Sequence, residues 1–147
     1  MAKKVTVSNL NKVYRSLGKK ADSFVREVKD QLLISATNIE SDATNLKPNM
    51  YGDIQITREP LNDGLTQLVK AGSLANDKFA AYAEFGTGSY AAATTASYPP
   101  FIKALAMQYY VNGQGRLPAK PYLIPTYLAN RKKFLENMRK LVKKYSA

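Results

Sequence analysis

The chain has 147 residues, is 45% hydrophobic and 22% charged, and carries a formal net charge of +11. This length fits one domain with one core, and the composition is near the globular average, so a disordered or membrane-embedded chain is not indicated. The chain contains no cysteine and no histidine, which excludes disulfides, thiolate nucleophiles, histidine bases and the common zinc, haem and iron–sulfur ligand sets. We therefore expect a protein that is not an enzyme and uses no cofactor or metal; a carboxylate-dependent hydrolase is the minor alternative.

No apolar run approaches the roughly 18 residues that a membrane-spanning helix needs. The basic residues near the N-terminus are not followed by the apolar segment of a secretory signal. We expect no membrane partner and a protein that is made and kept in a cytoplasm.

The positive charge lies at the two ends of the chain. Residues 1–20 carry six basic and no acidic side chains, residues 131–147 carry seven basic side chains against Glu136, and the remaining 110 residues carry nine basic and ten acidic ones. Two basic ends indicate an anionic partner such as nucleic acid or an acidic protein surface. The alternative is that these lysines only solvate the outer faces of two helices.

The first third of the chain has helical periodicity. Residues 5–7 are β-prone and predict a short edge strand, and Ser8 is a candidate N-cap for a helix that Gly18 ends or kinks. A second helix, from Ala21 to about Leu46, has apolar residues at intervals of three and four, and Pro48 stops it. This long helix is the expected spine of the fold.

The pattern changes to period two after residue 53, where Ile54 and Ile56 alternate with polar residues. A turn over residues 59–64, marked by Asp63-Gly64, then predicts a β-hairpin over residues 53–71. Residues 78–85 are alanine-rich and predict a short helix or strand that Gly86 halts.

Residues 89–100 are small, uncharged and aperiodic, which predicts a mobile surface loop. Residues 101–111 predict a helix with Ile102, Leu105, Ala106 and Tyr109 on one face. From Thr126 a final helix is expected to bury Tyr127, Leu128, Phe134, Leu135, Met138, Leu141, Val142 and Tyr145. No linker or internal repeat divides residues 1–147, so we expect a single domain.

Two segments combine glycine or proline with aromatic and charged residues. They are Tyr82-Ala83-Glu84-Phe85-Gly86-Thr87-Gly88 and Pro118-Ala119-Lys120-Pro121-Tyr122-Leu123-Ile124-Pro125. The glycine pair is too short for a phosphate-binding loop, and no Gly-Lys-Ser/Thr follows it. Glu84 is expected to cap a turn or to meet a basic neighbour, and a structural or inter-subunit salt bridge is favoured over catalysis. The ten tyrosines favour core packing over stacking on nucleic-acid bases.

In their order along the chain, these features resemble the HK97 gp10-like family of tailed-phage neck proteins, the head–tail joining or tail-completion proteins. The resemblance covers nearly the whole chain and rests on the two segments above, together with Asp42-Ala43-Thr44-Asn45-Leu46-Lys47-Pro48 at the end of the long helix. Tyr122 stands where the family usually has phenylalanine, and residues 89–100 look like an insertion.

The resemblance implies an α+β fold, with a long N-terminal helix and a C-terminal helix packed on a small antiparallel sheet. It implies a structural virion protein that joins head and tail as a ring, a hexamer or dodecamer, beside connector, head-completion and tail-tube proteins. Its location would be the virion neck, after assembly in the bacterial host cytoplasm. The alternative function is a small basic nucleic-acid-binding protein.

We predict that the two segments lie close together and form the ring contact, because glycines permit a tight reversal and prolines dock at low entropic cost. The alternative is that they serve only the packing of their own chain. The interface candidates are Tyr82, Glu84, Phe85, Gly86, Thr87, Gly88, Pro118, Lys120, Pro121, Tyr122 and Pro125. Lys140, Lys143 and Lys144 are expected to face solvent and packaged DNA.

Overall fold

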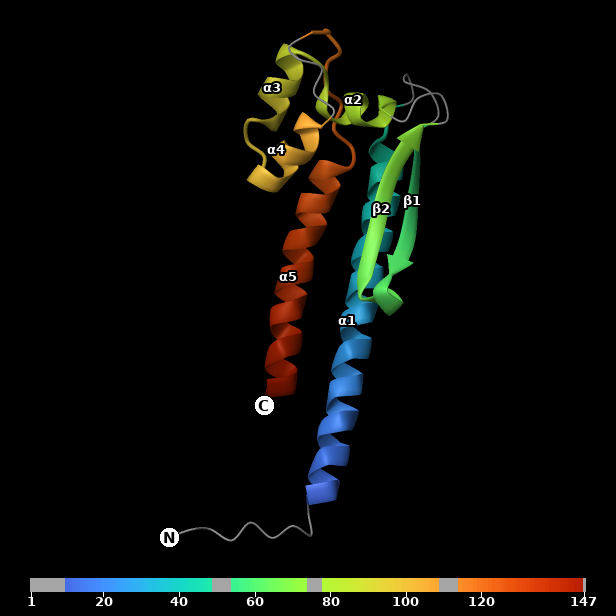
Figure 1. Ribbon diagram of the computed structural model, residues 1–147, viewed down its shortest axis with the longest axis vertical. Helices are drawn as coiled ribbons and strands as arrows, with labels where there is room; N and C mark the ends of the chain where they lie inside the picture. Colours follow the sequence, from blue (N-terminus) through green and yellow to red (C-terminus); the bar gives the residue numbers. More distant parts are fainter. Residues whose placement is uncertain (1–9, 49–53, 74–77, 109–113, 147) are drawn as a thin grey trace.

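The computed structural model describes residues 10–48, 54–73, 78–108 and 114–146, with the side chains of the first range from residue 15 onward. These residues form five α-helices, one short 3-10 helix and one two-stranded antiparallel sheet (Figure 1). The fold is α+β, as predicted, with a long N-terminal helix, a hairpin and a C-terminal helix. The strand expected at residues 5–7, the turn at residues 49–53 and the last part of the helix expected at 101–111 lie outside the described residues.

Helix α1 (Leu10–Leu46) has 37 residues and is about 55 Å long. It passes through Gly18, so the expected end of a first helix at this position is wrong. A glycine inside a helix costs about 1 kcal/mol relative to alanine, which is too little to interrupt a helix that good helix formers continue on both sides. A Cβ added at Gly18 would have nothing within 4 Å.

Strands β1 (Ile54–Leu61) and β2 (Thr66–Ser73) form the expected hairpin, and their register pairs the first residue of β1 with the last residue of β2. The connection contains the short helix η3 (Asn62–Gly64), whose three residues all have positive φ. Asparagine, aspartate and glycine adopt this conformation at the least cost. β1 continues through Pro60, which was expected in the turn; proline is tolerated because a two-stranded sheet consists of edge strands.

Three short helices follow. α2 (Phe79–Phe85) confirms the helical alternative for residues 78–85 and ends at Gly86, where φ is 76°. α3 (Ser89–Thr95) replaces most of the loop that was expected at residues 89–100, because its alanines are the strongest helix formers even without an apolar period. α4 (Pro100–Met107) begins at a proline, whose missing N–H is not needed at the first position of a helix.

The last helix, α5 (Ile124–Ser146), runs antiparallel to α1, so the start of α1 and the end of α5 lie at the same end of the molecule (Figure 1). The Phe24 and Tyr145 rings pack edge to face at 5.4 Å between centroids. Further along, Asn137 Nδ2 donates to Gln31 Oε1 at 3.1 Å.

The core lies at the other end of the two long helices, where α2 packs on the hairpin through one cluster and on α4 through a second. Its two clusters consist of Ala43, Ile54, Ala80, Ala83 and Tyr122, and of Phe85, Ile102, Ala106 and Ile124. Of the stripe that α5 was expected to bury, Leu141 is buried, whereas Leu135 and Val142 are more than a third exposed. The long helices therefore carry apolar side chains that their own chain covers only in part.

Candidate functional site

The two motif segments lie side by side within one chain, and we call residues 82–88 together with residues 117–124 the interlock. Thr87 N donates to Leu117 O at 3.0 Å, and Leu117 N donates back to Thr87 Oγ1 at 2.9 Å. Lys120 N donates to Ala83 O at 2.8 Å. The prediction that the segments lie close together is confirmed.

Glu84 is the centre of the interlock. Its carboxylate is 3% exposed and accepts three backbone hydrogen bonds at 2.8 Å, from the N–H groups of residues 122, 123 and 124. These groups lie at the start of α5, where a helix has no backbone acceptors of its own for its first N–H groups. Glu84 thus caps α5 from a distant part of the chain, and its negative charge lies at the positive end of the helix dipole.

Burial raises the pKa of Glu84 above its usual range, and the three backbone N–H groups oppose that rise. Among the described residues, no ion pair within the chain involves Glu84, and the capping role is the one that the geometry supports. A salt bridge between subunits stays a prediction. A carboxylate whose two oxygens already accept from the backbone is not placed to act on a substrate.

The glycines of the interlock are required by close backbone approach. A Cβ at Gly86 would lie 2.9 Å from both Ala119 N and Leu117 O, and a Cβ at Gly88 would collide with the carbonyl oxygen of Gly115. Both glycines also have positive φ, 76° and 59°, which side chains rarely adopt. Glycine therefore lets residues 86–88 and residues 115–119 lie against each other.

Tyr122 completes the interlock. Its side chain is fully buried, and its hydroxyl donates to Ala80 O at 3.0 Å. Burial, with a smaller contribution from the Glu84 charge, raises the pKa of the phenol well above its usual range. Tyr122 therefore stays neutral and ties α2 to the start of α5.

The predicted interface residues differ in their exposure. Buried in their own chain are Glu84, Phe85, Gly86, Thr87, Gly88 and Tyr122; half-buried are Tyr82 and Pro121; exposed are Pro118, Lys120 and Pro125. Phe85 and Tyr122 therefore use their apolar area within one chain, and only the exposed members of the set are accessible to a neighbour.

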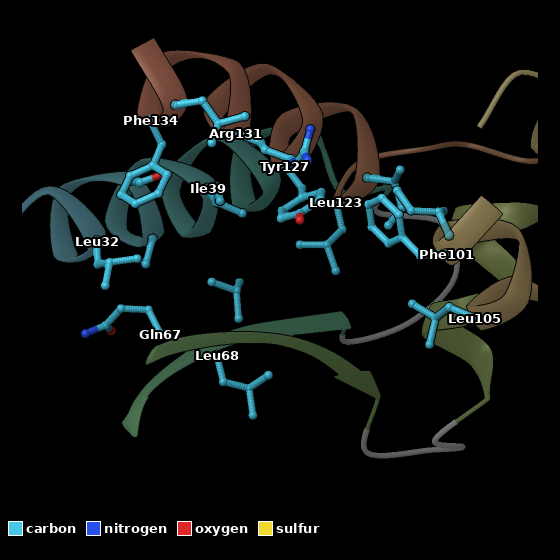
Figure 2. Close-up of a pocket in the computed structure, with 16 residues that line it drawn as sticks. Leu32, Ile39, Gln67, Leu68, Phe101, Leu105, Leu123, Tyr127, Arg131 and Phe134 are labelled. Atoms are coloured by element: carbon cyan, nitrogen blue, oxygen red, sulfur yellow. The ribbon is translucent and has the colours of Figure 1, made fainter. Parts of the chain in front are cut away.

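A large apolar groove lies beside the interlock, and we call it the trough. It has a volume of about 490 Å³ and lies between α1, β2, α4 and α5 (Figure 2). Leu32 and Ile39 of α1 form its floor, and the rings of Phe101, Tyr127 and Phe134 line its sides. Its polar lining side chains are Ser35, Gln67 and Arg131.

Periodicity predicted several trough residues, but as core. Leu105 was expected on the buried face of its helix, yet it is 43% exposed and points into the trough; Leu135 is 39% exposed. Apolar residues at helical spacing identify a face that avoids water, but they do not distinguish a covered face from an open one.

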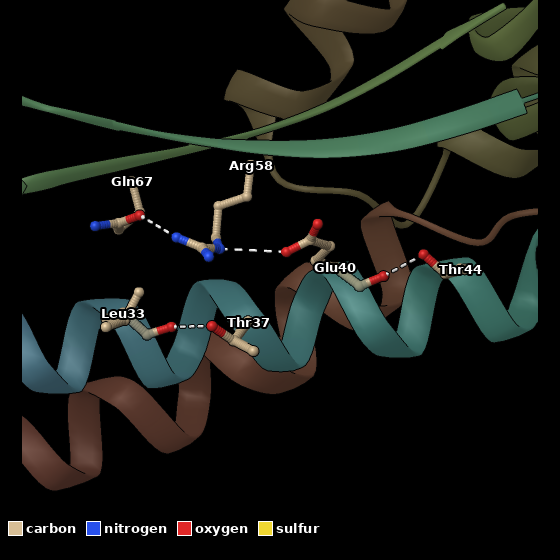
Figure 3. Close-up of polar contacts among 6 residues, drawn as sticks. All are labelled: Leu33, Thr37, Glu40, Thr44, Arg58 and Gln67. Atoms are coloured by element: carbon tan, nitrogen blue, oxygen red, sulfur yellow. Dashed lines mark hydrogen bonds and ion pairs between the residues drawn. The ribbon is translucent and has the colours of Figure 1, made fainter.

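The hairpin wall of the trough is held against α1 by Arg58 (Figure 3). Its Nε donates to Glu40 Oε2 at 3.2 Å, and its Nη1 donates to Gln67 Oε1 at 3.4 Å. A second link joins the hairpin turn to α1, where Lys29 Nζ meets Asp63 Oδ2 at 2.8 Å. These links join both the strands and the turn of the hairpin to α1.

Basic side chains gather at the end of the molecule opposite the interlock. We call Arg15, Lys19, Lys20, Lys140, Lys143 and Lys144 the basic pole, and all six are exposed, as predicted for the last three. Lys144 also makes contacts: its Nζ donates to Glu27 Oε1 at 2.8 Å and lies 5.3 Å from the centroid of its neighbour Tyr145. The hydrogen bond from Lys144 lowers the pKa of Glu27.

Within the described part of the chain, no three acidic residues are grouped so that they could hold a metal ion. None of the described helices is long and apolar enough to cross a membrane. The described surface thus offers two accessible features, the apolar trough and the positively charged basic pole.

No protein-family model, curated protein or solved structure matches this chain. The case for a function therefore rests on the geometry of the trough, the interlock and the basic pole, together with the motif resemblance.

Proposed function

We propose that this chain is a structural virion protein of a tailed phage, a ring-forming neck or tail-completion subunit that joins head and tail. The observation that carries the proposal is the open apolar trough. Four of the side chains that line it, Leu68, Phe101, Leu105 and Leu135, are more than a third exposed. Apolar surface of this extent is typical of a chain that completes its burial by assembly.

A ring also needs two different surfaces on each subunit, because a head-to-tail contact joins unlike patches. The trough is one of them. Leu33 and Ile34, 42% and 52% exposed, form an apolar ridge on α1, and helical spacing places them on the opposite side from Leu32 and Ile39. We propose that the ridge of one subunit fills the trough of the next.

The interlock supports this role by holding the frame of the trough. It attaches the start of α5 to α2, and α5 supplies Tyr127 and Phe134 to the trough wall. Of the exposed members of the predicted interface, Pro118 and Lys120 belong to the interlock and Pro125 directly follows it. We assign these residues to contacts with the neighbouring connector, head-completion or tail-tube rings.

The test is the mass of the purified chain in solution. We expect native mass spectrometry to detect a closed ring, a hexamer or dodecamer, for the wild type. Leu105→Asp places a charge inside the trough, so it should give monomers with an unchanged melting temperature. Met107→Asp is the matched control, because Met107 is on the same helix, is 74% exposed and does not line the trough.

A wild type that stays monomeric at every concentration, or a Leu105→Asp variant that assembles like Met107→Asp, would contradict the proposal. Incorporation of the variants into phage particles is an independent test of the proposal. The control should enter particles at the wild-type level, and Leu105→Asp should be missing from them.

A further inference from the structure

The antiparallel pairing of α1 and α5 brings the two basic ends of the sequence to one place. Glu27 links the two helices here, because its carboxylate accepts from Lys144 Nζ at 2.8 Å and from Tyr145 Oη at 2.6 Å. Residues far apart in sequence, such as Lys20 and Lys144, therefore line one surface. The sequence alone did not indicate that the two ends form a single site.

A cleft of about 340 Å³ lies between the two helices at this surface. The residues that line it are Ser16, Lys19, Lys20, Ser23, Lys144 and Tyr145. None of the six is acidic, and all carry hydroxyl or ammonium groups, although the Tyr145 hydroxyl already donates to Glu27. Hydroxyl and ammonium groups are the side chains that contact phosphate oxygens in protein–nucleic acid complexes.

Placing like charges side by side is unfavourable for a folded chain. Here Glu27 offsets one positive charge, and its two hydrogen bonds go to Lys144 and Tyr145. Lys19 and Lys20 form no ion pair within the described residues. A polyanion at the cleft would remove this repulsion.

We propose that the basic pole binds the phosphate backbone of double-stranded nucleic acid, with one phosphate in the cleft between α1 and α5. This site goes beyond the ring proposal and does not depend on it, since each chain carries the whole cleft. It differs in location and chemistry from the trough.

The aromatic contacts favour a duplex over a single strand. Single-strand binding relies on aromatic rings that are free to stack on bases. Tyr145, the aromatic residue of the cleft, packs edge to face on Phe24 and gives its hydroxyl hydrogen to Glu27. The cleft therefore offers charge to a backbone and no open ring to a base, so binding should be independent of sequence.

The test is the fluorescence anisotropy of a short labelled DNA duplex titrated with the wild-type protein at several salt concentrations. About four phosphate contacts would make the affinity fall roughly 100-fold between about 50 and 200 mM salt. Lys19→Gln/Lys20→Gln should weaken binding at least tenfold at the lower salt and make the salt slope shallower by about two units. The matched control is Lys103→Gln/Arg116→Gln, which removes the same charge from exposed residues at the opposite end of the molecule (Figure 1).

Equal loss of duplex affinity in both double variants would show attraction by net charge alone and would overturn the site. A wild type that does not bind the duplex would also overturn it. A single strand bound more tightly than the duplex would overturn the duplex assignment. Binding to phosphatidylglycerol vesicles that needs Lys19 and Lys20, without duplex binding, would assign the cleft to a membrane surface instead. The masses of the same samples separate the two proposals, because the Leu105→Asp monomer should still bind the duplex.

Discussion

The interlock and the trough lie next to each other but differ in how far the chain buries its own side chains. In the interlock, Glu84 and Tyr122 are at most 3% exposed, and the carboxylate and the phenol are hydrogen-bonded within the chain. In the trough, Phe101 and Leu105 remain 52% and 43% exposed. The motifs that carry the family resemblance therefore build the fold of one chain, and the surface suited to assembly lies beside them.

Because of this difference, changes in the two regions should be detected by different measurements. A change in the interlock should reduce the free energy of unfolding, because each group there has a partner that would be left unsatisfied. A change at an exposed trough residue such as Leu105 should leave unfolding unchanged and affect association, because its side chain is already in contact with water. The following predictions test this separation.

The largest loss of stability is expected for Glu84→Ala, which leaves three N–H groups, two buried and one partly buried, without an acceptor. At about 1–3 kcal/mol for each buried unsatisfied donor, the loss should be at least about 3 kcal/mol. Glu84→Gln is the milder variant. It keeps one acceptor oxygen but turns an amide donor toward backbone donors, so urea unfolding should detect a loss of about 1–3 kcal/mol.

Glu59→Gln is the control, since the ion pair of Glu59 with Lys70 is more than half exposed and should contribute little. A Glu84→Gln variant as stable as this control would show that the cap is not needed.

Substituting alanine for glycine should have opposite effects on stability at a close backbone approach in the interlock and on the open surface of α1. Gly88→Ala places a Cβ against the Gly115 carbonyl oxygen at positive φ and should cost about 1–3 kcal/mol. Gly18→Ala puts the same methyl group on an open helical turn and should stabilise α1 by up to about 1 kcal/mol. Thermal melting checks both, and equal shifts for the two variants would refute the close approach.

Tyr122→Phe removes one buried hydrogen bond, so at neutral pH it should cost about 1 kcal/mol. A larger effect on the free energy of unfolding is expected at alkaline pH. The pKa of Tyr122 is raised in the folded chain, so the unfolded chain releases this proton near its ordinary value of 10.0 while the folded chain retains it. The stabilisation is therefore complete below pH 10.0 and is lost as the pH rises above that value.

Urea unfolding of the wild type and Tyr122→Phe between neutral pH and pH 11 checks this difference. The two stabilities should converge as the pH rises. Tyr90→Phe, at an exposed tyrosine, is the control and should follow the wild type. A constant gap between Tyr122→Phe and the wild type would contradict the proposed burial.

Local signals predicted much of the fold. Alternation at Ile54 and Ile56 with Asp63-Gly64 after them located the hairpin, and the paired glycine and proline motifs located the interlock. Two local errors concern helix continuity. Gly18 was expected to end or kink a helix, but α1 continues through it. The alanines of residues 91–93 were expected in a loop because they show no apolar periodicity, although their intrinsic propensity favours a helix.

The role of Glu84 could have been found from the start of α5. Pro125 marks a first helical turn, and the preceding Tyr122 and Leu123 offer no capping side chain, so the cap had to come from elsewhere. The trough could not be predicted in this way. Its shape depends on the spacing between α1, the hairpin and α5, which tertiary links such as Arg58 to Glu40 set.

The most direct test of the ring account is a mixture of two variants that are each blocked on one side. Leu105→Asp has a damaged trough and an intact ridge, whereas Ile34→Asp has an intact trough and a damaged ridge. Each alone should be monomeric. Mixed in equal amounts, they should form dimers and nothing larger, because one intact ridge meets one intact trough and the remaining surfaces are blocked. A mixture that stays monomeric while the wild type assembles, or one that forms complete rings, would contradict the account.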